Sequence, residues 1–330
     1  MRKELEYLFD HKTLSKSKAK ELLVNIAKGT YNPSQLASFL TVFIMRSITV
    51  EELEGFRDAL LELCLKIDLS EFDTVDLCGT GGDGKDTFNI STISSFIVAG
   101  AGIKVAKHGN YGVSSSCGSS NVIQHLGYEF TNDEDKLKRQ IETAGICFLH
   151  APLFHPAMKN IAPIRKEMGV KTFFNMLGPM VNPSSPKNQL VGVFNLELAR
   201  LYSYLYQTSG KQYVILHTLD GYDEISLTAD FKMITNEGEF LLTPNDLGLR
   251  QLKLEDLYGG STIEAAATVF VKILEGQGTD AQIEVVTANA GMAIHCVKPN
   301  ISIVDCIEMA KESIISGSAL DSLNKLLKNG

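Results

Sequence analysis

The segment TVDLCGTGGDG, residues 74–84, decides the fold class of this chain. It begins with a short run of β-type residues, Thr74–Leu77, and passes at once into four glycines within six residues, Gly79–Gly84. Glycines allow positive φ and a close approach of the backbone to a ligand, and successive amides can then face one anion. A glycine cluster by itself is equally well a tight turn without a ligand. The segment predicts a strand that ends in a loop suited to phosphate.

The residues after this loop strengthen the phosphate interpretation. Thr87, Asn89, Ser91 and Thr92 supply hydroxyl and amide groups where the next helix is expected to begin. A helix N-terminus attracts phosphate through its unpaired amides and its dipole. The loop is neither the P-loop of nucleotide triphosphatases, because the GxxxxGK motif is absent, nor the dinucleotide-binding fingerprint.

Strands and helices alternate along the rest of the chain. Further short strands are predicted at 103–106, 146–149 and 213–216, with helical segments at about 92–101, 119–126, 156–168 and 196–209. A hairpin is predicted within 232–242, and the C-terminal segment reads as helices again. Alternation of this kind indicates an α/β layer with a mostly parallel sheet. In such folds ligands bind where the carboxyl ends of the strands meet loops.

The first part of the chain reads as short helices with recognisable caps. Ser15 is placed to cap one helix, Asn32-Pro33 starts the next, and Thr49 with Glu52 forms a capping box for a third. We therefore predict a small N-terminal helical domain, residues 1–70, and a larger α/β domain, residues 71–330, with a mostly parallel central sheet. The apolar faces of the first domain fit either a packed bundle or a dimer contact.

Composition argues against several classes of protein. The net charge of the 330 residues is −8, whereas a general nucleic-acid binder usually carries a basic stripe. No apolar run approaches the ~20 residues of a membrane-spanning helix, and the N-terminal stretch lacks the apolar centre of a secretory signal. The six cysteines form no CxxC pair, which argues against a zinc site or a disulfide framework. We expect a cytoplasmic protein that binds neither nucleic acid nor membrane.

Three further segments carry candidate chemistry. Lys107-His108-Gly109-Asn110 leads into a run rich in serine and glycine, which is either a plain surface loop or a second phosphate-binding loop. Asp223-Glu224 is either a pair of solvated charges or, beside a pyrophosphate, a Mg²⁺ site, since Mg²⁺ prefers one or two carboxylates together with phosphate and water. Arg165 is either exposed on its helix or holds a substrate carboxylate through its planar guanidinium group.

Together these segments resemble the anthranilate phosphoribosyltransferase family. The motifs that carry the resemblance are GTGGDG (79–84), TFNIST (87–92), KHGN (107–110) with Gly118-Ser119, HPAM (155–158) with Arg165, NMLGP (175–179) and Asp223-Glu224. The resemblance covers essentially the whole chain. It implies a fold of the nucleoside phosphorylase/phosphoribosyltransferase type, in which the helical domain forms a homodimer and is joined by helices near 155–180.

The implied activity is transfer of the 5-phosphoribosyl group from phosphoribosyl pyrophosphate (PRPP) to the amine of anthranilate, with release of pyrophosphate, in tryptophan biosynthesis. No residue is expected to act as an essential acid or base. The residues expected to bind anthranilate are Gly79, Asn110 and Arg165. The residues expected to bind Mg²⁺, as two ions per subunit, are Ser91, Asp223 and Glu224. The residues expected to bind PRPP are Gly79, Gly82, Asp83, Thr87, Asn89, Ile90, Ser91, Thr92, Lys107, His108, Gly109, Asn110, Tyr111, Gly112, Val113, Ser114, Ser115 and Ser119.

The segment Lys107–Ser115, which the resemblance implies closes over PRPP as a flap, departs from the family pattern. The family commonly has arginine where this chain has Tyr111, serine where it has Cys117 and aspartate where it has Asn121. Loss of the arginine removes a cation near the phosphates.

Two other functions remain open. A pyrimidine nucleoside phosphorylase shares the architecture, but its glycine loop has a Lys-His lead that Leu77-Cys78-Gly79-Thr80 lacks. A non-enzymatic relative that binds nucleic acid would need a basic groove and would have no use for the Asp223-Glu224 pair. The acidic balance of the chain and the presence of that pair both argue against it.

Overall fold

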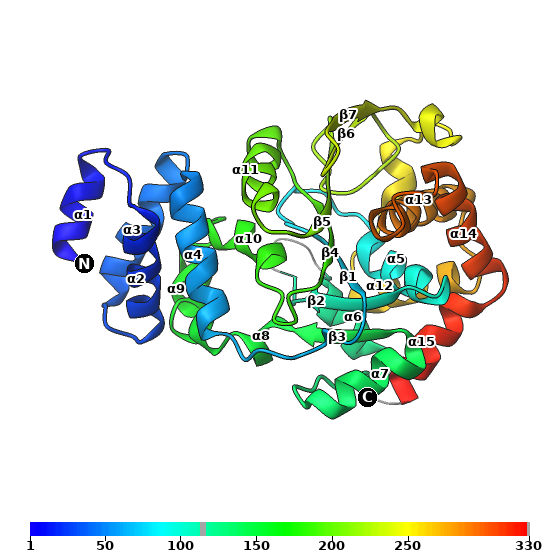
Figure 1. The fold of residues 1–330 in the computed structure, drawn as a ribbon, viewed down its shortest axis with the longest axis horizontal. Coiled ribbons are helices and arrows are strands. Elements are labelled where there is room, and N and C mark those ends of the chain that lie inside the picture. Colours follow the sequence, from blue (N-terminus) through cyan, green and yellow to red (C-terminus); the bar gives the residue numbers. More distant parts are fainter. Residues whose placement is uncertain (113–116, 329–330) are drawn as a thin grey trace. The chain divides into compact units, whose positions relative to one another are not determined.

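The computed structural model describes residues 1–112 and 117–328. The chain folds into two compact units, each built from two stretches of sequence (Figure 1). The first unit comprises Met1–Lys66 and Ala151–Pro183, and the second comprises Ile67–His150 and Ser184–Gly330. The chain therefore leaves the helical unit, returns to it once, and then completes the α/β unit.

The helical unit consists of short helices, three of which begin at side-chain caps. Its elements are α1 (Arg2–Phe9), α2 (Lys16–Ala27), α3 (Pro33–Met45), α4 (Val50–Leu63), α8 (Ala151–Phe154), α9 (Ala162–Met168) and α10 (Phe174–Leu177). The Ser15 hydroxyl caps α2, Asn32 caps α3, and Thr49 with Glu52 forms a capping box at α4. The caps predicted from the sequence are confirmed.

An aromatic cluster joins the two stretches of the helical unit. Phe56 on α4 stacks on Phe173 of the returning segment, with ring centroids 4.4 Å apart. Phe39 and Phe43 on α3 meet Phe173 edge-on. Aromatic pairs of this kind stabilise a core beyond the burial of their area. The segment around Phe173 is thus part of the core of the helical unit, although three strands of the other unit precede it in the sequence.

A buried carboxylate ties the first helices together. The Glu52 side chain is 0% exposed. It accepts hydrogen bonds from Arg46 Nη2 at 2.6 Å, from Arg46 Nη1 at 2.9 Å and from the Leu14 amide at 2.9 Å. Because a buried charge is tolerated only when it is paired and hydrogen-bonded, the position of Glu52 depends on all of these donors.

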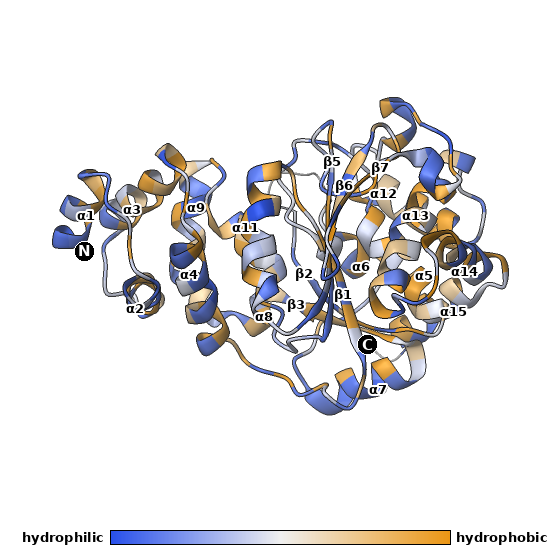
Figure 2. Cartoon of the chain, turned by 45° about the horizontal axis from the view of Figure 1, so that its top comes forward, coloured by the Kyte–Doolittle hydropathy of each residue, from blue (hydrophilic) through white to orange (hydrophobic). Residues whose placement is uncertain are grey.

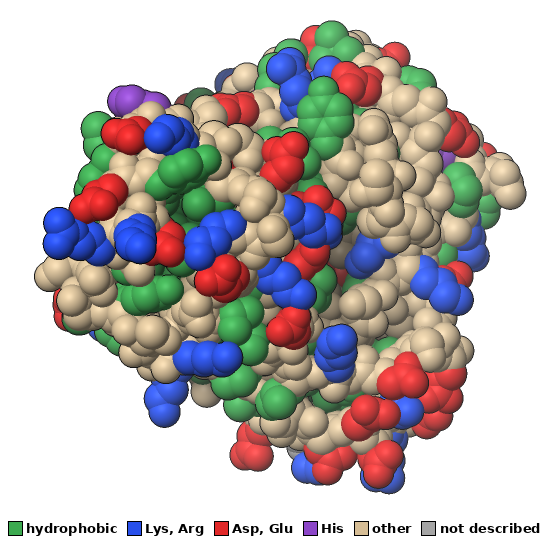
Figure 3. Space-filling view, turned by 60° about the vertical axis from the view of Figure 1, so that its left-hand side comes forward, with side chains coloured by type: hydrophobic (Ala, Val, Ile, Leu, Met, Phe, Trp, Pro, Cys, Tyr) green, Lys and Arg blue, Asp and Glu red, His purple; other side chains and the backbone are tan. Residues whose placement is uncertain are grey.

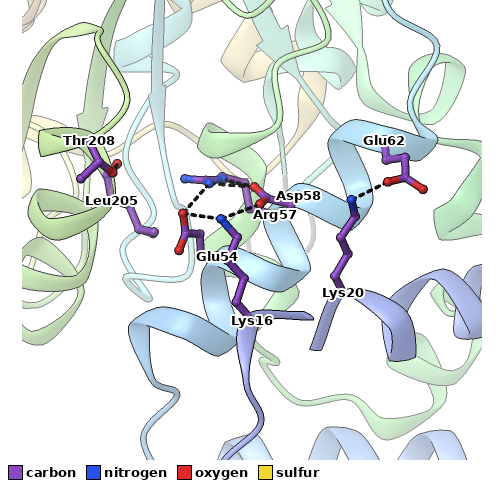
Figure 4. Close-up of polar contacts among 8 residues, drawn as sticks. All are labelled: Lys16, Lys20, Glu54, Arg57, Asp58, Glu62, Leu205 and Thr208. Carbon is purple, nitrogen blue, oxygen red and sulfur yellow. Dashed lines mark hydrogen bonds and ion pairs between the residues drawn. The ribbon is translucent and has the colours of Figure 1, made fainter. Parts of the chain in front are cut away.

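Other ion pairs on the same unit are more exposed to water. Lys16 lies 2.8 Å from Glu54 and 3.0 Å from Asp58, and Lys20 pairs with Glu62 (Figure 4). Exposed ion pairs contribute only about 0–1 kcal/mol to stability. Figure 3 shows basic and acidic side chains interspersed over the face that it presents, without a basic stripe on that face.

In the part of the chain that the structure describes, the α/β unit is built on one sheet of seven strands in the order β3-β2-β1-β4-β5-β6-β7. The five parallel strands are β1 (Thr74–Gly79), β2 (Lys104–Gly109), β3 (Ile146–His150), β4 (Asn188–Gly192) and β5 (Gln212–Thr218). The antiparallel strands β6 (Phe231–Thr235) and β7 (Glu239–Leu242) form the predicted hairpin at one edge. The predicted mostly parallel sheet is confirmed.

Helices cover both faces of this sheet (Figure 2). On one face α5 (Ile90–Gly100) and α13 (Asp280–Val297) pack against each other and against the central strands, while α11 (Leu196–Gln207) packs against β5 on the other. The remaining α-helices are α6 (Ser119–His125), α7 (Glu134–Ala144), α12 (Ile263–Leu274), α14 (Ile303–Ile315) and α15 (Ser318–Lys328). Within the described residues, none of the helices combines the length and the apolar character needed to cross a membrane.

Two features of the chain differ from the prediction. The helix predicted over 156–168 is interrupted, because Pro156–Asn160 forms a 3-10 helix and α9 begins only at Ala162, with Pro163 in its first turn. Proline has no amide hydrogen and is tolerated only in the first turn, so it marks a start rather than an interior position. Strand β4 was not predicted, because it is short and opens with the polar pair Asn188-Gln189.

We expect Glu52→Ala to destabilise the helical unit strongly. The substitution leaves the Arg46 guanidinium group without its carboxylate and the Leu14 amide without its acceptor. Removing one partner of a buried ion pair costs about 3–5 kcal/mol. Urea unfolding followed by circular dichroism measures the loss. Glu62→Ala, which removes an exposed carboxylate from the same unit, is the matched control and should leave the unfolding curve unchanged. Equal unfolding curves for the two variants would contradict the stabilising role of the Glu52 carboxylate.

Candidate active site

The loop after β1 depends on the backbone freedom of glycine. Gly81, Gly82 and Gly84 have φ angles of +66°, +79° and +76°, a region that other L-residues adopt only at a cost. Between them, the Asp83 carboxylate accepts a hydrogen bond from the Lys85 amide at 3.1 Å. The loop therefore turns tightly, as the glycine cluster predicts.

The adjacent carboxylates of Asp223 and Glu224 meet this loop and the start of the next helix. The Gly81 amide donates to Asp223 Oδ2 at 2.6 Å, and the Ser91 amide donates to Glu224 Oε1 at 2.9 Å. Ser91 lies in the first turn of α5, where amides lack partners within the helix and the dipole favours negative charge. The structure thus brings together three segments that the sequence analysis singled out separately.

Two facing glycines make room for Asp223. Gly79 at the end of β1 and Gly192 at the end of β4 are register partners in the sheet. A Cβ atom on Gly79 would overlap the Asp223 carboxylate, and one on Gly192 would overlap the Asp223 carbonyl oxygen. Gly192 escaped the sequence analysis, because a single glycine at the end of an unpredicted strand gives no local signal.

Burial and mutual repulsion perturb the carboxyl groups. Burial, with Asp83 as the next cause, raises the pKa of Asp223 to about 7. Burial, and then the neighbouring Asp223, raises the pKa of Glu224 well above its ordinary value. Burial also raises the pKa of Asp83. Like charges this close cannot all ionise unless a cation neutralises them.

The donor set fits Mg²⁺ with substrate phosphate rather than a metal site built from protein alone. Ser91, Asp223 and Glu224 provide one hydroxyl and two carboxylates. Across residues 1–112 and 117–328, no three side chains of histidine, cysteine, aspartate or glutamate are arranged to hold a metal ion. Mg²⁺ typically takes one or two carboxylates and completes its shell with phosphate and water, which matches this set.

Lys107 lies within strand β2 and not in the following loop, which corrects the prediction that the strand ends before it. Its side chain is 1% exposed, and Nζ donates to the Leu77 carbonyl oxygen at 2.6 Å. Burial lowers the pKa of Lys107, while nearby Asp76 opposes that shift. Asp76 also accepts from the His108 amide at 3.1 Å. Lys107 therefore holds its ammonium group against strand β1, two residues before the first glycine of the loop.

The described residues on either side of 113–116 are held together by neutral hydrogen bonds. Asn121 Oδ1 accepts from the Gly112 amide at 2.9 Å and from the Gly118 amide at 3.0 Å. Asn89, just before α5, donates from Nδ2 to the Cys117 carbonyl oxygen at 3.0 Å. Asn121 is one of the positions that depart from the family pattern, and its bridging role was not predicted.

Other predicted residues surround the same region. The Ser119 hydroxyl is 3.2 Å from both the amide and the carbonyl oxygen of Asn110. A Cβ atom on Gly109 would overlap the Phe148 ring, so this glycine permits close packing of the strands. Val113, Ser114 and Ser115 lie outside the described residues.

Some predicted side chains point into the protein. Ile90 and Thr92 are 0% and 1% exposed, so a contact with a ligand would come from their backbone. Thr87 forms an isolated bridge with Tyr258. Its strand-like pairing holds the segment that leads into α5.

Tyr111 takes part in an aromatic contact. Its ring meets the His150 ring edge-on, with centroids 4.8 Å apart, and its hydroxyl donates to Gln124 Oε1 at 3.2 Å. His150 stacks in turn on Phe130 at 4.1 Å. Burial lowers the pKa of His150 to about 4, so its ring is neutral near pH 7.

Arg165 lies on α9 in the helical unit, where neighbours fix its side chain. Its Nη2 donates to Asn175 Oδ1 at 3.2 Å, and its guanidinium carbon lies 5.2 Å from the centre of the Phe174 ring. Asn175 Oδ1 also accepts from the Thr172 amide at 3.2 Å. Burial lowers the pKa of Arg165, although an arginine stays charged at neutral pH. The guanidinium group is therefore oriented before any ligand arrives.

A small cavity adjoins the two carboxylates. Its lining is formed by Leu77, Cys78, Ser91, Ser94, Leu190, Gly192, Leu216, Asp223, Glu224 and Asn289. Asn289 on α13 was not singled out in the sequence, because an asparagine on a mostly apolar helix has no distinctive pattern.

The sequence matches two family models. The one described as the glycosyl transferase family, a/b domain, matches residues 71–320. The one described as the glycosyl transferase family, helical bundle domain, matches residues 3–64.

Curated relatives match along nearly the whole chain. The anthranilate phosphoribosyltransferase of Flavobacterium psychrophilum is 65% identical over 326 residues, which are 99% of this chain and 98% of that protein. The protein of the same name from Flavobacterium johnsoniae is 62% identical over equal shares of the two chains. The one from Bacteroides thetaiotaomicron is 53% identical over 328 residues, 99% of each chain.

Solved structures of anthranilate phosphoribosyltransferases have the same fold as this chain. The crystal structure of anthranilate phosphoribosyltransferase from Thermus thermophilus has a TM-score of 0.91 at 29% identity and covers 98% of both chains. The enzyme from Saccharomyces cerevisiae in complex with PRPP and Mg has a TM-score of 0.91 at 26% identity, covering 98% of this chain and 96% of that one. The Saccharomyces cerevisiae enzyme in complex with 4-fluoroanthranilate has a TM-score of 0.88 at 25% identity over the same shares.

We expect Gly192→Ala to displace the segment that carries Asp223. The added methyl group would overlap the Asp223 carbonyl oxygen, and overpacking of this kind costs about 1–3 kcal/mol. Thermal unfolding should show a lower midpoint. Gly178→Ala is the control, because its Cβ atom would meet nothing within 4 Å and its φ of −46° suits any residue. An unchanged midpoint for Gly192→Ala would show that Asp223 does not need this glycine.

Proposed function

The chain belongs to the anthranilate phosphoribosyltransferase family, and we propose on this basis that it transfers the 5-phosphoribosyl group of PRPP to the amine of anthranilate and releases pyrophosphate. One observation carries the proposal. The hydrogen bonds of Asp223 to the Gly81 amide and of Glu224 to the Ser91 amide put two carboxylates beside an anion-binding loop. Such an arrangement receives a pyrophosphate only together with a cation.

Most of the donors proposed to hold PRPP are neutral. The amides of Gly81 in the glycine loop and of Ser91 in the first turn of α5 donate to the two carboxylates. The start of α5 adds the favourable end of its dipole. Lys107, whose buried ammonium group is held against strand β1 just before the loop, adds a positive charge. These features support local capture of a polyanion by a chain whose net charge is −8.

Mg²⁺ is proposed to bind at Ser91, Asp223 and Glu224. When bound, it supplies charge neutralisation to the pyrophosphate leaving group. The raised pKa values of Asp223 and Glu224 support this assignment, because both carboxyl groups are held in a place that favours a neutralising partner. The number of ions per subunit, expected to be two, stays a prediction.

The residues of the chain act on the reaction by binding and positioning. The bond between ribose C1 and pyrophosphate breaks, and the ribose passes through an oxocarbenium-like state. The amides of the glycine loop and of the α5 N-terminus stabilise the charge that develops on the pyrophosphate. The anthranilate amine then forms the new bond to C1 and loses its proton after attack. No residue needs to act as a strong base, and orientation of the amine supplies much of the remaining acceleration.

Arg165 is proposed to bind the anthranilate carboxylate. Its guanidinium group is oriented by Asn175 and by the Phe174 ring, and a planar guanidinium group suits a carboxylate. Gly79 and Asn110 are the other residues proposed to contact the acceptor. The Arg165 guanidinium group beside the apolar segment that contains Phe174 favours an acceptor that is a planar aromatic acid.

A homodimer formed through the helical unit is proposed as well. Large apolar side chains are exposed on two of its helices, with Tyr7 and Phe9 on α1 and Ile44 and Met45 on α3. Exposed apolar clusters of this kind mark contacts between proteins. A role in tryptophan biosynthesis follows from the proposed reaction, and the cytoplasmic location stays a prediction.

The two alternative functions gain no support. The relatives that match over the whole chain carry the transferase name, and no comparison cited above favours a phosphorylase. A nucleic-acid binder needs a basic stripe. The face shown in Figure 3 has basic and acidic side chains interspersed and no such stripe.

We expect the purified chain to consume anthranilate only when both PRPP and Mg²⁺ are present. The decrease of anthranilate fluorescence with time measures the reaction, and excess EDTA should abolish it because the buried carboxylates and the pyrophosphate then lack their cation. If anthranilate fluorescence did not decrease at micromolar enzyme with both PRPP and Mg²⁺ present, the proposed function would be contradicted. The phosphorylase and nucleic-acid-binding functions would then be tested.

Separate roles are expected for the two charged sites. Asp223→Asn and Glu224→Gln should lower kcat by about 10²–10³, as loss of transition-state charge stabilisation does, and should raise the Mg²⁺ concentration required. Arg165→Ala should raise the KM for anthranilate by roughly 10–100-fold, since a charged hydrogen bond contributes about 1.5–3 kcal/mol. Arg139→Ala, which removes an exposed arginine on α7, is the control. Equal effects of all three site variants on both parameters would contradict this division.

A further inference from the structure

The two carboxylates lie on a loop with a strained backbone. Residues 219–230 connect β5 to β6, and the Leu219 amide closes the base of the loop by donating to the Asp230 carbonyl oxygen at 2.9 Å. Within the loop, Leu227 is fully buried and has a φ of +60°. A bulky residue adopts positive φ only where its surroundings enforce it. The loop therefore depends on contacts from outside itself to keep this shape.

Thr218, the last residue of β5, provides one such contact. Its side chain is buried, and Oγ1 donates to the Glu224 carbonyl oxygen at 2.6 Å. Its own amide donates to the Tyr222 carbonyl oxygen at 3.1 Å. The two bonds bracket Asp223, because they fix the backbone immediately before and immediately after it.

Asn289 on α13 provides the other contact. Its Oδ1 accepts from the Ile225 amide at 3.0 Å, and its Nδ2 donates to the Ile225 carbonyl oxygen at 2.8 Å. The same Nδ2 donates to the Val285 carbonyl oxygen at 2.9 Å, which fixes the amide group relative to its own helix. Asn289 is 3% exposed. It pairs with the backbone of Ile225 as a neighbouring strand would, from a mostly apolar helix.

We propose that Thr218 and Asn289 are positioning residues that set the Mg²⁺ affinity of Asp223 and Glu224. This inference rests on the proposed function. Their side chains bond to the backbone on either side of the carboxylate pair, so they act through that backbone. Mg²⁺ demands near-ideal octahedral geometry at about 2.0–2.1 Å, so that a small shift of this backbone is enough to weaken the ion's hold. Simple support of the fold is the competing explanation, and metal affinity distinguishes the two.

Thr218→Val and Thr218→Ser form a matched pair of variants. Valine keeps the shape of threonine without its hydroxyl, and serine keeps the hydroxyl without the methyl group. Binding of Mn²⁺ in the presence of PRPP, followed by electron paramagnetic resonance of the free ion, reports the metal site without any turnover. We expect the valine variant to bind Mn²⁺ about fivefold more weakly, the effect of losing one net hydrogen bond, and the serine variant to bind it as the native chain does.

Ser322→Ala is the control for a purely structural effect. Ser322 on α15 is buried, and its hydroxyl donates to the Ala144 carbonyl oxygen at 2.6 Å. Its loss removes a bond of the same kind away from the carboxylates. We expect a lower midpoint of thermal unfolding but an unchanged Mn²⁺ dissociation constant. Asn289→Ala is the second test variant, and we expect it to weaken Mn²⁺ binding as well. It tests the proposal independently in case Thr218→Val does not fold.

The outcomes separate this inference from the proposed function. Native Mn²⁺ binding in both Thr218→Val and Asn289→Ala would overturn the positioning role and leave the reaction untouched. Equal weakening in the valine and serine variants would overturn the role of the hydroxyl. If the native chain itself bound no Mn²⁺ with PRPP present, the proposed function would fail and the positioning role with it.

Discussion

The adjacent carboxylates of Asp223, which is buried, and Glu224, which is half-buried, have to be held close together, and the hydrogen bonds and glycines around them follow from this constraint. Burying charge is costly unless hydrogen bonds compensate, and here the Gly81 amide and the Ser91 amide do so. Space is equally limited, and only glycine at positions 79 and 192 leaves room for Asp223. The glycine loop, the start of α5 and the end of β4 thus all contact the same pair of residues, Asp223 and Glu224.

The same constraint explains why the site suits a metal-bound anion rather than a free one. Burial, and then repulsion from the neighbouring carboxylates, raises the pKa values of Asp223 and Glu224. Free phosphate would add to that repulsion. A divalent cation turns this repulsion into attraction, because it neutralises the protein's carboxylates and binds phosphate oxygens at the same time. The resemblance to a Mg²⁺-dependent family therefore has a physical counterpart in the geometry.

Local signals in the sequence were enough for much of the fold and for part of the site. Ser15, Asn32 and Thr49 act within one helical turn, so their caps were predictable, and the glycine loop followed a strand as its sequence indicates. Strand β4, Gly192 and Asn289 were missed for a different reason. Their roles arise from packing against residues distant in the chain, and a polar start, a lone glycine or a lone asparagine carries no local trace of such a partner. The resemblance supplied binding roles but not these supporting residues.

The flap shows how a missing cation changes the charge balance of the site. Tyr111 stands where an arginine is common, and its neighbours do not replace the lost charge, because Gln124 is neutral and burial lowers the pKa of His150 to about 4. Asn121 likewise joins the described residues on either side of 113–116 with a neutral amide where an aspartate is common. The negative group that Asn121 replaces lies on α6 (Ser119–His125), outside the flap, so the flap itself carries one positive charge fewer than the family pattern. The attraction for phosphate that we propose then rests on Lys107, the loop amides and the metal. Lys107 is the first residue of the flap segment, but it lies within strand β2.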